Sequence, residues 1–184
     1  VIGGYNAGAR NQNEEYDPAL NTWASKASMP TPRLQSVSGA VSGRIYALGG
    51  WIGSNINLNE EYDPGANTWA TKTSMPSVRY QLGTASVGGK LYAVGGTTGG
   101  GVLLNMNEEY DPVVNIWTTR SAMPTARYAA SAAVVGGKIY LVGGNAGGVI
   151  NKNEEYDPGV ATKFVGLTAN TSYSFKAKAR NLLG

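Results

Sequence analysis

The sequence predicts an all-β fold, a β-propeller of four-stranded antiparallel blades, and three observations support this. The hexapeptide Asn-Glu-Glu-Tyr-Asp-Pro occurs four times, and its tyrosines are 46, 48 and 46 residues apart: Tyr16, Tyr62, Tyr110 and Tyr156. Apolar runs are short and separated by turn residues, and no helical period is sustained. A repeat of this length indicates an array or a propeller, because one unit cannot bury its own apolar faces.

The second unit shows why each repeat should contain four strands. Four short segments rich in apolar or β-branched residues are separated by turn residues: residues 35–41, 45–48, 59–63 and 68–72. Pro64 suits the first corner of a turn, and Asn67 can adopt a left-handed backbone before the last strand. Hairpin spacing of this kind predicts one antiparallel blade per unit.

Side-chain size predicts how the blades are arranged about their axis. Three segments are small throughout and should lie innermost, where space is least: residues 36–40, 82–86 and 129–133. Large aromatic residues recur in the outer strands, where they should fill the gaps between blades: Tyr16, Tyr62, Tyr110, Trp23, Trp69 and Trp117.

The order of these motifs can be compared with known repeats. Gly-Gly, Tyr-Asp-Pro, x-x-Asn-x-Trp, Met-Pro-x-x-Arg and Gly-Gly-Lys-Ile-Tyr follow one another in register over residues 1–158. This set resembles the kelch repeat of β-propellers. The units lie near residues 1–44, 45–90, 91–138 and 139–158, which implies about three and a half to four blades.

Residues 159–184 depart from the repeat. Lys163 stands where the tryptophan is expected, so this stretch begins as a degenerate last strand. Residues 166–184 resemble part of a fibronectin type III domain, with Leu167 six positions before Tyr173 and an alternating strand after it. About two such strands are too few to bury a core.

The first unit begins at its second strand, so its innermost strand is lacking. We therefore expect the ring to be completed by the remainder of a larger propeller or by a second copy in a homo-oligomer. An unpaired blade edge would favour such association. A structural assembly module completed by another chain is accordingly one possible function.

Composition limits the other functions. Four of the 15 basic residues follow Asp157, which leaves 11 basic and 12 acidic residues in the repeats and no basic stripe. Nucleic-acid binding is therefore not expected. No apolar run reaches about 18 residues, so no membrane span is expected. The fibronectin-like tail and the lack of cysteine favour an extracellular or cell-surface location, which the sequence does not otherwise define.

The sequence contains few residues at non-repeating positions that could act in catalysis. All 12 acidic residues lie inside the four hexapeptides, so each carboxylate has near-identical siblings, and no metal or cofactor site is expected. Galactose oxidases share the kelch architecture, but their copper site needs histidine and cysteine, and the chain has neither. We therefore predict no enzymatic activity. The sialic acid mutarotases, which use arginine and carboxylate groups in a central pocket, are the alternative.

The loops between the second and third strands vary while their flanks repeat, which is where recognition can diversify on a rigid scaffold. Trp51 is the one tryptophan outside the repeat pattern, and it lies near Ser54 and Asn55. Together with Tyr5 these residues could stack on a sugar ring or dock a peptide. The alternative is that Trp51 merely covers its own blade.

Three arginines, each after a Met-Pro pair, complete the candidate binding set: Arg33, Arg79 and Arg127. The resemblance to peptide-binding kelch domains suggests that they hold carboxylates, with Tyr80 and Tyr128 beside them. Because all three share one repeat position, bonding to the neighbouring blade is an equally good explanation. The sequence thus predicts a binding or scaffold module that recognises a glycan or a protein segment through the loops of one face.

Overall fold

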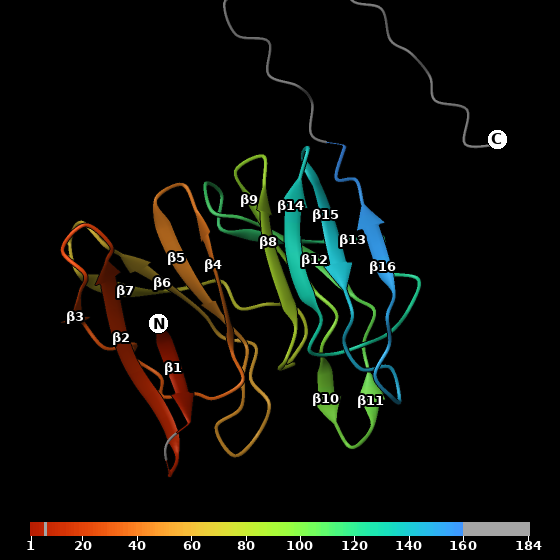
Figure 1. The fold of residues 1–184 in the computed structure, drawn as a ribbon, viewed down its shortest axis with the longest axis horizontal. Coiled ribbons are helices and arrows are strands. Elements are labelled where there is room, and N and C mark those ends of the chain that lie inside the picture. Colours follow the sequence, from red (N-terminus) through yellow and green to blue (C-terminus); the bar gives the residue numbers. More distant parts are fainter. Residues whose placement is uncertain (6, 160–184) are drawn as a thin grey trace, which may run out of the picture.

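The computed structural model describes residues 1–5 and 7–159. This part of the chain contains sixteen β-strands and no helix, so the predicted all-β class is correct. The strands form four main sheets, named blades I to IV in chain order. Figure 1 shows the blades side by side, from blade I with the N-terminus on the left to blade IV on the right.

Blades II and III each have four antiparallel strands paired in sequence order. Blade II consists of β4 (Val37–Val41), β5 (Arg44–Leu48), β6 (Asn59–Asp63) and β7 (Thr68–Lys72). Blade III consists of β8 (Gly83–Val87), β9 (Lys90–Val94), β12 (Asn107–Asp111) and β13 (Ile116–Arg120). The loop between β9 and β12 adds a small hairpin, β10 (Thr97–Gly99) and β11 (Val102–Leu103).

Blades I and IV each have three strands within the described residues. Blade I consists of β1 (Ile2–Tyr5), β2 (Ala9–Asp17) and β3 (Thr22–Lys26), and it has no counterpart of the inner strand β4. Blade IV consists of β14 (Ser131–Val135), β15 (Lys138–Val142) and β16 (Asn153–Tyr156). The prediction of three and a half to four blades is therefore correct. The predicted degenerate strand and fibronectin-like pair fall almost wholly in residues 160–184, outside the described part.

The inner strands β4, β8 and β14 are the ones with small residues, as predicted. A side chain on Gly39 would begin 2.5 Å from Leu91 Cδ1 in blade III, so the neighbouring blade leaves no room for it. The hydroxyls of Thr84 and Ser86 donate to the Ser38 and Ala40 carbonyls at 3.0 and 2.6 Å. Small residues therefore allow the inner strands to bond directly across the blade junction.

Each Gly-Gly pair contacts the backbone of the segment that links its blade to the next blade. Gly49 has a φ of 56°, and a Cβ there would lie 2.4 Å from the Arg79 carbonyl oxygen. The adjacent Gly50 N–H donates to the same oxygen at 3.1 Å. Gly95 and Arg127 repeat this approach one blade later. The close backbone contact explains why the repeat needs glycine at this position.

Two apolar cores lie at blade junctions. Tyr46 and Leu48 of blade II pack with Leu91 and Tyr110 of blade III, and the two tyrosine rings are 5.5 Å apart. Val87, Tyr92 and Val94 of blade III pack similarly with Ile139 and Leu141 of blade IV. Each buried side chain of this size contributes about 1.5–3 kcal/mol.

The predicted role of the repeat aromatics differs along the chain. Tyr62 and Tyr110 are buried at blade junctions, and Trp69 and Trp117 are half-buried. Tyr16 and Trp23 of blade I are exposed, because no described blade covers their side of the sheet. The packing prediction is therefore correct for blades II and III and wrong for these two residues.

Candidate functional site

The candidate site lies on the face of the molecule that carries the loops between the second and third strands. The hairpin β10–β11 marks this face at the lower edge of Figure 1. On it, the residue that follows each arginine forms an isolated bridge with the first residue of the next loop: Leu34 with Trp51, Tyr80 with Thr97, and Tyr128 with Asn145. We call these residues and their loops the loop face.

Each bridge is a pair of reciprocal backbone hydrogen bonds. The Trp51 N–H donates to the Leu34 carbonyl at 2.9 Å, and the Trp51 carbonyl accepts the Leu34 N–H at 3.2 Å. Tyr80 and Thr97 exchange bonds of 3.1 and 3.0 Å in the same way. Because the strands of the blades fix both partners, the loop-face side chains are held on a rigid base.

Hydrogen bonds hold the backbone of Trp51 in place, while the residue is partly exposed to solvent. Its residue is 39% exposed, and it also bridges to Asn55 across the loop. Ser54 is exposed at the tip of the loop, and its carbonyl accepts the Ile52 N–H at 3.1 Å. This loop therefore carries a partly exposed tryptophan together with a hydroxyl and an amide, those of Ser54 and Asn55.

The loops of blades II and III are joined to each other. The Asn55 side-chain amide donates to the Thr98 carbonyl in the loop of blade III. Thr97 Oγ1 in turn donates to the Val102 carbonyl at 2.6 Å and accepts the Gly99 N–H at 2.9 Å. These bonds connect the Trp51 loop to the hairpin β10–β11. The sequence analysis did not single out Thr98, although its loop, residues 97–106, is two residues longer than the loop at residues 51–58.

The two link tyrosines are half-buried. The Tyr80 hydroxyl would lie 3.3 Å from a Cβ on Gly99, so its side chain reaches the hairpin of blade III. Tyr128 stands at the equivalent position before blade IV and is bonded to Asn145. Tyr5 lies at the end of β1, paired with Ala9. Apart from Tyr5, whose side chain is not described, the predicted aromatic residues therefore gather on the loop face.

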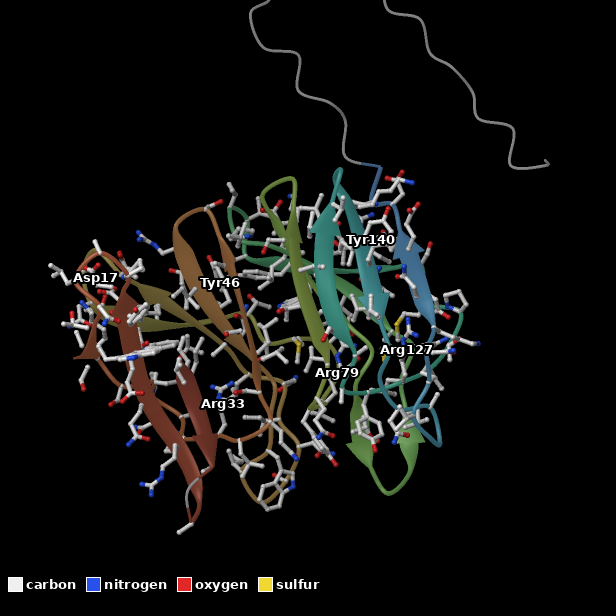
Figure 2. The ribbon with its side chains drawn as sticks, viewed as in Figure 1. Asp17, Arg33, Tyr46, Arg79, Arg127 and Tyr140 are labelled. Carbon is white, nitrogen blue, oxygen red and sulfur yellow. The ribbon has the colours of Figure 1, made fainter. Side chains whose placement is uncertain are left out.

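The three arginines occupy a different environment. Figure 2 shows Arg33, Arg79 and Arg127 in a row through the lower half of the molecule, one at each blade junction. All three are completely buried. The Arg79 guanidinium donates to Glu108 Oε2 at 2.7 Å and to the Ala93 and Gly95 carbonyls at 3.0 and 2.9 Å.

Arg33 and Arg127 make the same type of contact with the third strand of the following blade. Arg33 pairs with Glu60 and donates to the Gly49 carbonyl at 3.1 Å. Arg127 Nη2 lies 3.1 Å from Glu154 Oε2. Burial lowers the pKa of Arg33 and of Arg79, and the paired carboxylates oppose that effect. The arginines therefore bond to the neighbouring blade. This is the second of the two explanations that the sequence offered, the first being that they hold the carboxylates of a ligand.

The other carboxylates of blades II and III also have structural partners. Glu61 accepts from the Tyr46 hydroxyl and pairs with Lys72 at 3.2 Å. Glu109 repeats this with Tyr92 and Arg120. Within the described residues, no group of three acidic side chains could hold a metal ion. No helix in the same part of the chain is long and apolar enough to cross a membrane.

Comparison with known proteins adds two findings. The kelch motif model matches residues 32–76, 79–124 and 126–160. The solved structure described as "Structure of YjhT" superposes with a TM-score of 0.67 at 18% sequence identity, over 79% of this chain. The chain spans 58% of the length of YjhT. No curated protein sequence matches the chain.

These comparisons correct one prediction. The prediction that this chain is not an enzyme is contradicted by its likeness in fold to YjhT. The sequence argument rested on histidine, cysteine and the repeated carboxylates, and these are not the only side chains that can act as an acid or a base. Kelch motifs also generally mediate protein interactions, which agrees with the coarser part of the partner prediction.

Proposed function

Because the chain belongs to the kelch-motif family, we propose that its loop face binds a carbohydrate and that the chain acts on this sugar as a mutarotase-type enzyme. Two findings support the proposal: the shared fold of the sugar-acting YjhT and the rigidly held, partly exposed indole of Trp51. The second finding carries it, since it concerns this chain's own residues.

The role of Trp51 follows from the surface of a sugar ring. One face of a pyranose is largely C–H and packs against an aromatic ring, while its rim carries hydroxyls that need hydrogen-bond partners. Ser54 and Asn55 supply a hydroxyl and an amide carbonyl beside the indole. The bond from Asn55 to Thr98 fixes the loop before a ligand arrives, which reduces the ordering cost of binding.

Mutarotation requires a base and an acid at the anomeric centre. The anomeric hydroxyl loses its proton while the ring oxygen gains one, the ring C–O bond opens to the aldehyde, and closure on the other face reverses both transfers. Tyrosine hydroxyls can serve as such groups. Tyr80 and Tyr128 are the candidates on the loop face. The three buried arginines and their glutamates remain structural in this proposal.

A glycan-array screen of the native chain, with Trp51→Ala and Ile52→Ala beside it, tests recognition. Ile52 is the matched control, since it is an exposed apolar neighbour in the same loop and cannot stack as a ring. We expect the native chain and the Ile52 variant to bind the same sugars and the Trp51 variant to lose at least tenfold in affinity, about 1.4 kcal/mol. Equal binding by all three would remove Trp51 from the site.

A protein segment is the second candidate ligand, because kelch motifs generally mediate protein interactions. The partly exposed apolar residues Trp51, Ile52 and Val102 favour it. A peptide-display screen on the same three variants decides between the two ligands. Binding of peptides but of no sugar would replace the carbohydrate proposal.

A further inference from the structure

In blades II and III, three side chains at the outer edge of the sheet form hydrogen bonds that connect the blade to the preceding one. In blade II the Tyr62 hydroxyl donates to Asn67 Oδ1 at 2.8 Å, and the rings of Tyr62 and Trp69 are 5.1 Å apart. Asn67 has a left-handed backbone conformation, with a φ of 54°. We call this combination of tyrosine, asparagine and tryptophan the aromatic clasp.

The aromatic clasp binds both backbone groups of a single residue. Asn67 Oδ1 accepts the Ala27 N–H at 2.8 Å, and Trp69 Nε1 donates to the Ala27 carbonyl at 2.7 Å. In blade III, Asn115 and Trp117 bond Thr73 in the same manner at 3.0 and 2.8 Å. Ala27 and Thr73 are each the first residue after the outer strand of the preceding blade, β3 and β7.

Blade I has the aromatic clasp already formed, and no described blade occupies it. The Tyr16 hydroxyl donates to Asn21 Oδ1 at 2.7 Å, the φ of Asn21 is 54°, and the rings of Tyr16 and Trp23 are 5.1 Å apart. Tyr16 is nevertheless 42% exposed and Trp23 59%, whereas Tyr62 is 2% exposed. We call the surface formed by Tyr16 and Trp23 the leading flank of blade I. It is preorganised to contact a blade that is absent from the described residues.

Blade IV has the opposite surface uncovered. Val135 and Val142 are 65% and 49% exposed, whereas the equivalent Val87 and Val94 of blade III are 6% and 2% exposed because blade IV packs on them. The valines at the end of β14 and β15 thus form a trailing flank of the kind that, in blade III, is buried by the next blade.

We propose that a second copy of this chain seats the leading flank of its blade I, Tyr16 and Trp23, on the trailing flank of blade IV, Val135 and Val142. The successive blades of one chain already pack in this way, so the repeat itself supplies the complementary shape. The contact is head-to-tail, which closes a ring if the rotation allows it. Two copies contribute about eight blades, the upper end of the usual range for propellers.

A mixing experiment followed by sedimentation velocity tests this contact. The head variant carries Tyr16→Ser and Trp23→Ser, and the tail variant carries Val135→Lys and Val142→Lys. All four residues are exposed, and circular dichroism checks that both variants remain folded. A head-to-tail contact predicts that the native chain associates as its concentration rises, that each variant alone is monomeric, and that an equal mixture forms a one-to-one complex.

The mixture works because each variant retains the flank that the other has lost. A native chain that stays monomeric over the whole concentration range would overturn the proposal. So would self-association of either variant alone, since that would require a symmetric contact between like flanks. A mixture that remains monomeric while the native chain associates would also refute it. None of these outcomes depends on whether the loop face binds a sugar.

Discussion

Arg79 and Glu108 form an ion pair inside the molecule, with Nη2 2.7 Å from Oε2 and neither side chain exposed to solvent. The arginine belongs to the link that enters blade III, and the glutamate lies in the third strand of that blade. Arg33 with Glu60 and Arg127 with Glu154 repeat the pair at the other two junctions. The pairs therefore fix each link to the blade it introduces.

Replacing Arg79 should be strongly destabilising. Arg79→Met leaves the Glu108 carboxylate buried without its partner, and the Ala93 and Gly95 carbonyls lose a donor. We expect the free energy of unfolding in urea to fall by roughly 3–5 kcal/mol. The control is Lys26→Met, which breaks the solvated pair with Glu15 and should change the stability far less, because water screens that pair. Equal losses would show that burial is not what makes the Arg79 pair important.

Gly49 should tolerate no side chain. In Gly49→Ala the new Cβ would meet the Arg79 carbonyl oxygen at 2.4 Å in addition to the strain of a positive φ. Gly43→Ala imposes a similar φ, 74°, with nothing within 4 Å. We expect Gly43→Ala to cost about 1 kcal/mol and Gly49→Ala clearly more, measured by urea unfolding. Equal costs would mean that the carbonyl contact relaxes without penalty.

The sequence predicts local features well and long-range pairings poorly. The hexapeptide and the Gly-Gly pairs are sufficient to place the strands of blades II and III, because turn chemistry and alternation are local. The role of Arg33 is not decided by its neighbours in sequence, since its partner Glu60 lies 27 residues on, in the third strand of the blade that the link enters. The link from Asn55 to Thr98 likewise depends on how two loops meet across a junction. Such contacts arise from tertiary packing.

Alkaline pH should weaken the fold partly through Tyr92. Burial raises the pKa of its hydroxyl above the ordinary value of 10.0, and the 2.6 Å bond to Glu109 raises it further. A raised pKa in the folded state means that this stabilisation is complete below about pH 10 and is lost as the pH rises beyond it. The free energy of unfolding should therefore decline above about pH 10, and Tyr92→Phe should make that decline shallower. An unchanged slope would contradict this assignment.

The aromatic clasp offers a comparison within one chain. Trp69→Phe removes the bond from Nε1 to the Ala27 carbonyl at a half-buried junction, whereas Trp23→Phe alters the same repeat position where no described blade is bonded. In dilute protein we expect a loss of about 1 kcal/mol for Trp69→Phe and a smaller change for Trp23→Phe. Thermal unfolding of both variants measures the difference. A larger loss from Trp23→Phe would mean that its indole is already bonded.

The most direct test of the proposed function is the rate at which the protein interconverts the anomers of a sugar that the array identifies. Exchange NMR on the native chain, Trp51→Ala and Ile52→Ala gives this rate for each. The account predicts faster exchange than in buffer for the native chain and the Ile52 variant, and a loss of at least tenfold for the Trp51 variant. Native exchange no faster than in buffer, for a sugar that is bound, would contradict it.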